Sequence, residues 1–288
     1  MTSTSSNLPA AVAVALETAT PDPGIRATTV AAGIPWSSIG WGDADDRPLL
    51  LIHGVTASAR IWWRIGPALA ATGRRVTAVD LPGHGRTGHW LGHHRFRDNA
   101  VDLAAWIREA GLDSRRLQIV GHSYGAMTAA ALPRAGIRPA TLVLLDPPAV
   151  PLARMAQMAS DPSEQPDREM TRAIATLTTA NPDWPARDVL AKAEALVQVD
   201  LEAARAILLE NGEWDGGRAD LADPAARGIP TWVVRGDPSV GGLLPDADIW
   251  ALAEIVGADH LITLIGAPHA PQRTHPKALV EALLRALG

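Results

Sequence analysis

Six short apolar runs recur along the chain, each about as long as one strand. They are apolar throughout rather than alternating, which is typical of strands buried on both faces of a parallel sheet. The runs cover residues 48–53, 75–80, 117–121, 141–146, 231–236 and 261–266. Helical patterns lie between or after them, at residues 59–72, 98–110, 124–132, 248–256 and 275–287, and residues 27–42 predict an antiparallel hairpin ahead of them. This alternation of strands and helices predicts a doubly wound α/β sheet.

One long segment breaks the alternation. Residues 147–227 have a helical pattern with several prolines and no convincing strand, and the segment is too long for a simple crossover loop. We therefore expect a helical lid over 147–227, inserted after the strand at 141–146 and flanked by a core made of residues 25–146 and 228–288. Residues 1–24 are predicted to form a disordered extension.

The amino-acid composition limits the classes of protein to which the chain can belong and the kinds of partner that it can bind. The chain has 288 residues, 47% of them hydrophobic, which is enough for a sizeable core. A net charge of −5 without a basic stripe argues against nucleic acid as a partner. Without cysteine there can be no disulfide, thiolate metal site or catalytic thiol.

The N-terminus does not have the pattern of a secretory signal, and no run of about 20 apolar residues predicts a membrane span. We expect a cytoplasmic protein that acts as a monomer or homodimer.

Polar residues stand where the predicted strands end. Parallel sheets bind ligands at the carboxyl ends of their strands. Here those ends carry Ser123, Asp146, Asp237 and His269, a set suited to acyl transfer. Ser123 lies in Gly-His-Ser-Tyr-Gly, a spacing that predicts a sharp turn from strand to helix with the serine exposed at its apex.

Four stretches, in order, carry a resemblance to a known family. They are LLIHG (50–54), VDLPGHGRT (79–87), VGHSYG (120–125) and GAPHA (266–270). With them the chain resembles the lidded, esterase- and lipase-like members of the α/β-hydrolase fold, over roughly residues 26–288. The resemblance implies a mostly parallel, eight-stranded sheet with a lid after the sixth strand, and a serine hydrolase that needs no cofactor.

The resemblance also implies roles for single residues. Ser123 would be the nucleophile rather than a helix N-cap, and His269 the general base. The acid would be Asp237, which follows the strand at 231–236, with Asp146 as the alternative. Backbone N–H groups of Val55 and Tyr124 would form the oxyanion hole.

The substrate is predicted less closely than the chemistry. We expect an ester or lactone of small to medium size with an apolar portion, bound by residues from the oxyanion loop, the chain beyond it and the lid: Gly54, Trp62, Trp63, Met155, Trp184 and Trp214. The same triad could instead cleave C–C bonds of β-diketones or amides, or the fold could serve as a ligand receptor. His89, His93 and His94 have no carboxylates at matching spacing, so we expect no metal site.

Overall fold

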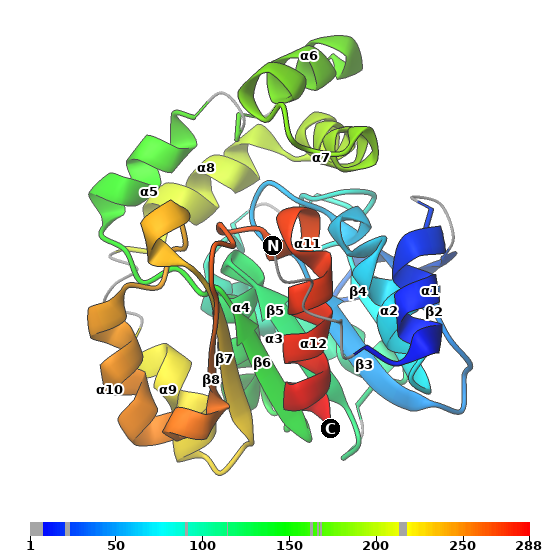
Figure 1. Ribbon diagram of the computed structural model, residues 1–288, viewed down its shortest axis with the longest axis vertical. Coiled ribbons are helices and arrows are strands. Elements are labelled where there is room, and N and C mark those ends of the chain that lie inside the picture. The colour runs from blue at the N-terminus through cyan, green and yellow to red at the C-terminus, as the bar shows by residue number, and fades with distance from the viewer. Residues whose placement is uncertain are drawn as a thin grey trace, which may run out of the picture.

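The computed structural model describes residues 8–20, 24–89, 92–113, 115–161, 164–165, 167, 169–212 and 218–288. Its centre is one eight-stranded sheet with the strand order β1-β2-β4-β3-β5-β6-β7-β8 (Figure 1). The strands are β1 (Ile25–Ala31), β2 (Ile34–Trp41), β3 (Arg47–Ile52), β4 (Arg74–Val79), β5 (Gln118–His122), β6 (Thr141–Leu145), β7 (Thr231–Gly236) and β8 (Leu261–Leu264).

Strand direction follows the expected pattern. β1 and β2 form an antiparallel hairpin, and β2 is also antiparallel to β4. From β4 to β8 all neighbours are parallel, so their carboxyl ends meet at one edge of the sheet. The predicted α/β sheet is confirmed, with strand bounds within two residues of those expected.

Helices cover both faces of the sheet (Figure 1). One face carries α3 (Phe96–Glu109), α4 (Tyr124–Ala131), α9 (Arg218–Ala226) and α10 (Asp246–Val256), and the other carries α1 (Ala10–Thr18), α2 (Ile65–Ala70) and α12 (Pro276–Leu287). The short elements are η1 (Ala59–Trp62), η2 (Leu132–Ala135), η4 (Pro238–Val240), η5 (Ala258–His260) and α11 (Pro271–Thr274). The single helix predicted at 59–72 is thus divided into η1 and α2.

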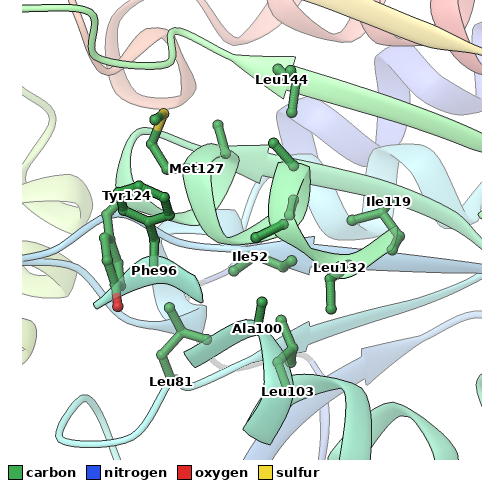
Figure 2. Packing of buried hydrophobic residues seen from close by; sticks show 14 of the residues in the cluster. Ile52, Leu81, Phe96, Ala100, Leu103, Ile119, Tyr124, Met127, Leu132 and Leu144 are labelled. Atoms are coloured by element: carbon green, nitrogen blue, oxygen red, sulfur yellow. The ribbon is translucent and has the colours of Figure 1, made fainter. Parts of the chain in front are cut away.

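Helix α4 packs in the centre of the larger core (Figure 2). Ile52, Ile119 and Leu144 reach it from three strands of the sheet, and all three are fully buried. Because α4 itself carries many alanines, it can approach the strands closely and places its N-terminus at the carboxyl edge of the sheet.

The N-terminal segment corrects the prediction of disorder for residues 1–24. Residues 10–18 form helix α1, which packs beside α2 and α12 (Figure 1). Val12 is fully buried and Leu16 is 6% exposed, both within the second core cluster. Residues 1–7 and 21–23 lie outside the described part of the chain.

Four helices inserted between β6 and β7 lie beyond the carboxyl edge of the sheet: α5 (Leu152–Ala159), α6 (Met170–Ala180), α7 (Ala186–Gln198) and α8 (Leu201–Glu210) (Figure 1). Helix α9 does not belong with them, because it packs against α4 and α10 and buries Leu221 in the main core. The predicted lid boundary at residue 227 therefore extends too far. Within the described residues, no helix is both long and apolar enough to span a bilayer.

Candidate active site

Ser123 lies at the turn between β5 and α4, as its motif predicts. Its backbone has φ 56° and ψ −122°, a left-handed conformation that costs a non-glycine residue about 1–3 kcal/mol. The Ser123 N–H donates to the carbonyl of Leu145 on the neighbouring strand at 2.9 Å, which holds the turn. The side chain is thereby presented at the carboxyl edge of the sheet.

Two glycines make this turn possible. A Cβ atom on Gly121 would lie 2.3 Å from the carbonyl oxygen of Gly125, and one on Gly125 would lie 2.4 Å from that of His53. Backbone atoms cannot yield at such distances, so both positions require glycine. The spacing of the motif therefore reflects close approach of the backbone on either side of Ser123.

His269 faces the serine from the loop between β8 and α11. Its Nε2 lies 2.9 Å from Ser123 Oγ. The loop is held by His122, whose Nε2 lies 2.8 Å from the carbonyl oxygen of His269 and donates to it. Burial lowers the pKa of His122 well below its ordinary value, so the ring is neutral with its proton on Nε2. His122, next to Ser123, thus positions His269.

Asp146, the alternative acid, is the carboxylate that contacts His269. Its Oδ2 lies 2.6 Å from His269 Nδ1, and the side chain is fully buried at the end of β6. The backbone N–H groups of Gly236 and Leu243 donate to the same carboxylate at 2.9 and 3.0 Å. With its proton on Nδ1, His269 leaves Nε2 free to accept one from Ser123.

The prediction that Asp237 is the acid that contacts His269 is wrong. Its Oδ1 accepts hydrogen bonds from the N–H and hydroxyl of Ser239, and its Oδ2 accepts one from the N–H of Gly266. These bonds lower the pKa of Asp237 and direct the carboxylate into its own turn, away from the imidazole. Asp237 caps η4 and fixes the start of the His269 loop.

Two buried histidines shape the loop that carries Gly54 and Val55. Nδ1 of His53 donates to the carbonyl of Gly54 at 2.7 Å, while its Nε2 accepts from the N–H of Leu81 at 3.0 Å. His84 reaches the carbonyl of Val55 with its Nε2. Burial lowers the pKa of both rings to about 4. These contacts fix the backbone of the loop beside Ser123.

Tyr124 opens α4 directly after Ser123, so its backbone N–H belongs to the first helical turn, where N–H groups have no acceptor within the helix. Its side chain points elsewhere, because the hydroxyl donates to the carbonyl of His94 at 2.9 Å. Gly54 and Val55 both line the cavity at Ser123. The two segments predicted for the oxyanion hole therefore flank the serine.

A cavity of about 320 Å³ opens at Ser123 and His269. Trp184 lines it, as expected, together with Ile61 from the core and Met158 from α5. A larger depression of about 520 Å³, lined mainly from β1, β2 and β4, holds neither a histidine nor a carboxylate. The smaller cavity is the one that Ser123 and His269 line.

Three residues predicted to bind substrate do not line this cavity. Trp62 is fully buried in the core and lies edge-on to His122. Trp63 is also buried, and its Nε1 donates to Asp188 at 2.9 Å. Met155 is packed in the main core cluster. Trp214 lies outside the described residues.

The cavity also holds charged side chains that the sequence analysis missed. Lys192 is 2% exposed, and its Nζ donates to Thr56 Oγ1 at 2.7 Å and to Glu164 Oε2 at 2.6 Å. Burial lowers the pKa of Lys192 to about 8. Burial raises the pKa of Glu164, but the charge and hydrogen bonds of Lys192 and Thr56 outweigh it, so the carboxyl pKa falls below its ordinary value.

A signal for Lys192 was present in the sequence. Val189, Ala193 and Leu196 form the buried stripe of α7, and Lys192 stands on that stripe, three residues after Val189 and four before Leu196. Asn181 and Arg273 also line the cavity, without a comparable pattern around them.

Comparisons with known proteins agree with this fold. A family model described as "Alpha/beta hydrolase family" matches residues 49–282. A pimeloyl-acyl-carrier-protein methyl ester esterase from Klebsiella pneumoniae (strain 342) is 28% identical over 262 residues, 86% of this chain and 95% of that protein. Lipase LipV from Mycobacterium tuberculosis is 29% identical over 273 residues, 86% of this chain and 96% of that protein.

Solved structures show the same fold. A thioesterase domain from the curacin biosynthetic pathway superposes with a TM-score of 0.72 at 23% sequence identity, over 91% of this chain and 100% of that one. At this level of identity the likeness concerns the fold alone.

Proposed function

The chain belongs to the alpha/beta hydrolase family, and we propose that it is a serine hydrolase that cleaves a carboxylic ester through an acyl-enzyme intermediate. The observation that carries this proposal is the continuous chain of contacts from Ser123 Oγ through His269 to Asp146, at 2.9 and 2.6 Å. A serine hydroxyl becomes nucleophilic when a base within hydrogen-bond distance accepts its proton.

In the proposed first half-reaction, Ser123 Oγ attacks the ester carbonyl carbon while its proton passes to His269 Nε2. Asp146 accepts the Nδ1 hydrogen bond and stabilises the imidazolium that forms. The electron pair of the carbonyl moves onto its oxygen, where the N–H groups of Val55 and Tyr124 would hold the negative charge. When the carbonyl re-forms, the alkoxide leaves and takes the proton from His269.

In the second half-reaction, water gives a proton to His269 and attacks the acyl-enzyme, which releases the acid and restores the Ser123 hydroxyl. A lactone is a cyclic ester and would follow the same steps, with its alkoxide tethered to the acyl group. These steps use only side chains, backbone amides and water. We propose that α5–α8 act as the lid over this site, since Met158 and Lys192 reach the cavity from α5 and α7.

The names of the curated relatives favour ester hydrolysis over the C–C or amide alternatives, since an esterase and a lipase match most of the chain. Ile61, Met158 and Trp184 give one side of the cavity an apolar lining suited to the apolar portion of a substrate. A cavity of about 320 Å³ fits a substrate of small to medium size. The contacts among Ser123, His269 and Asp146 give no support to a role as a receptor without catalysis.

Fluorophosphonate labelling followed by intact-mass measurement tests the proposal. Wild-type protein should gain one adduct, Ser123→Ala should gain none, and His269→Ala should react about a thousand-fold more slowly. Ser239→Ala removes an exposed serine outside the cavity and should label like wild type. Labelling of Ser123→Ala at the wild-type rate, or its undiminished turnover of p-nitrophenyl butyrate, would refute the proposal.

A further inference from the structure

Arg273 is a buried cation that the mechanism above does not use. It stands in α11, four residues after His269, and is 8% exposed. Its guanidinium carbon lies over the Trp184 ring, 4.7 Å from the ring centre, which is a cation–π contact. Arg273 and Trp184 both line the cavity that contains Ser123.

Apart from the Trp184 ring, the Arg273 side chain has no partner within the part of the chain that the structure describes. It makes neither a hydrogen bond to another described residue nor an ion pair, although a guanidinium carries five N–H donors. Other buried arginines are paired: Arg235 contacts Asp246 at 2.6 Å and Arg74 contacts Gln118 at 3.1 Å. The nitrogens of Arg273 are not among the fully enclosed unpaired atoms, so they remain accessible.

Neighbouring carboxylates are already engaged. Glu164 is held by Lys192, and Asp188 is held by Arg64 at 2.6 Å and by Trp63. Asp161 also lines the cavity, but it is exposed to solvent, where its charge is screened. Arg273 thus carries a charge that is largely removed from water, and the two carboxylates whose charges act on it, Glu164 and Asp188, hydrogen-bond to other residues. Its N–H donors are therefore left for an anion that a ligand supplies.

We propose that Arg273 binds a carboxylate of the substrate, so that the enzyme acts on esters that also carry a free acid group. This inference rests on the proposed ester hydrolysis at Ser123. A planar guanidinium pairs with a carboxylate through two parallel N–H···O bonds, and the Trp184 ring lies against the group. The apolar lining formed by Ile61 and Met158 would receive the carbon chain between acid and ester. Monoesters of short dicarboxylic acids have this shape.

Paired substrates separate charge recognition from size. Monomethyl adipate carries the free acid, and its carboxamide counterpart, methyl adipamate, has nearly the same shape without the charge. Wild type should show kcat/KM at least tenfold higher for the acid. Arg273→Gln should lower kcat/KM for the acid about 10- to 100-fold and change that for the amide less than threefold, since a hydrogen-bonded charge contributes about 1.5–3 kcal/mol.

Two variants control this experiment. Arg273→Lys keeps the charge but not the paired geometry, and it should recover part of the preference for the acid. Arg154→Gln removes an exposed arginine on α5 outside the cavity and should behave like wild type. If wild type prefers the amide, or if Arg273→Gln slows both substrates equally, Arg273 does not recognise the carboxylate.

Binding to Ser123→Ala distinguishes this proposal from the hydrolytic one. Calorimetric titration of that variant with monomethyl adipate should show binding that weakens at least tenfold when Arg273→Gln is added. The half-ester could bind in this way while wild type fails to label with fluorophosphonate. That result would support the carboxylate site and refute the role of Ser123 as nucleophile. Normal labelling with no such binding, or tighter binding of inorganic phosphate than of the half-ester, would overturn the carboxylate site.

Discussion

Ser123 and Asp146 share a backbone feature that is uncommon outside glycine. Their φ angles are 56° and 41°, and of the described non-glycine residues only Ala32 joins them at positive φ. Each follows a parallel strand. The N–H of Ser123 donates to the carbonyl of Leu145, and the N–H of Asp146 donates to the carbonyl of Val234. Strain of this kind persists only where surrounding contacts enforce it. Here it turns both side chains toward His269.

Replacing each candidate acid by asparagine tests which one supports His269. Asp146→Asn should lower kcat about a thousand- to ten-thousand-fold, because asparagine removes the negative charge and favours the wrong imidazole tautomer. Asp237→Asn should keep kcat within about threefold, since among the described residues its carboxylate hydrogen-bonds to its own turn and to Gly266 and not to His269. Steady-state turnover of p-nitrophenyl butyrate gives the comparison, with circular dichroism as the check on folding. A larger loss in Asp237→Asn would reverse the assignment.

The sequence could bring these aspartates to one edge of the sheet but could not choose between them. Both follow a strand in neighbouring positions, so strand order alone treats them alike. The choice depends on the φ of Asp146 and on the Asx-type turn Asp237-Pro238-Ser239, whose hydrogen bonds engage the competing carboxylate. The place of Arg273 in the cavity was equally hidden, because Arg273 reaches Trp184 only after folding.

The local sequence pattern predicted strands and helices wherever packing on the sheet determines which of their faces are buried. The apolar runs became β3–β8 because both of their faces are covered. The inserted helices differ, since α6 and α7 pack mainly on each other around Leu177, Val189 and Leu196. Their periodicity identifies a buried face without saying whether a partner helix or the cavity covers it. Trp184, which lines the cavity, lies in the turn between α6 and α7, whereas Met155 lies on α5 and packs in the main core cluster.

The packing of helix α1 on the core can be tested with three apolar residues of the same nine-residue helix. Val12 and Leu16 are buried against α2 and α12, whereas Val14 is 58% exposed on the opposite face. Val12→Ala and Leu16→Ala should each lower the free energy of unfolding by about 1–3 kcal/mol, and Val14→Ala by no more than about 0.5 kcal/mol. Urea denaturation measures all three. Equal, negligible effects would mean that the segment is disordered in solution.

At the scale of the whole molecule, the strand edge that carries Ser123, Asp146 and His269 also concentrates buried histidines. His53 and His84 are fully buried below the Gly54–Val55 loop, with ring centres 5.0 Å apart, and His122 lies behind Ser123. The opposite ends of the strands carry no such cluster among the described histidines. Acid should therefore destabilise the molecule from the active-site edge.

The two loop histidines set the direction of the pH dependence. Burial lowers the pKa of His53 and of His84 from 6.5 to about 4 in the folded state. Between these values the two rings bind more protons in the unfolded chain than in the folded one, so their contribution to the free energy of unfolding should rise with pH from about 4 to 6.5. Each histidine contributes a slope of up to about 1.4 kcal/mol per pH unit, and below pH 4 the whole contribution is lost.

Urea denaturation at a series of pH values measures that slope. His53→Gln and His84→Gln should each flatten it by removing one titrating group, even where the variant is less stable at every pH, because the slope depends on proton uptake and not on absolute stability. His275→Gln, on a loop residue that is partly exposed, should leave the slope unchanged. A wild-type stability that is flat from pH 4 to 6.5, or a slope that neither loop variant alters, would mean that the two rings are protonated in the folded protein and hold the Gly54–Val55 loop as cations.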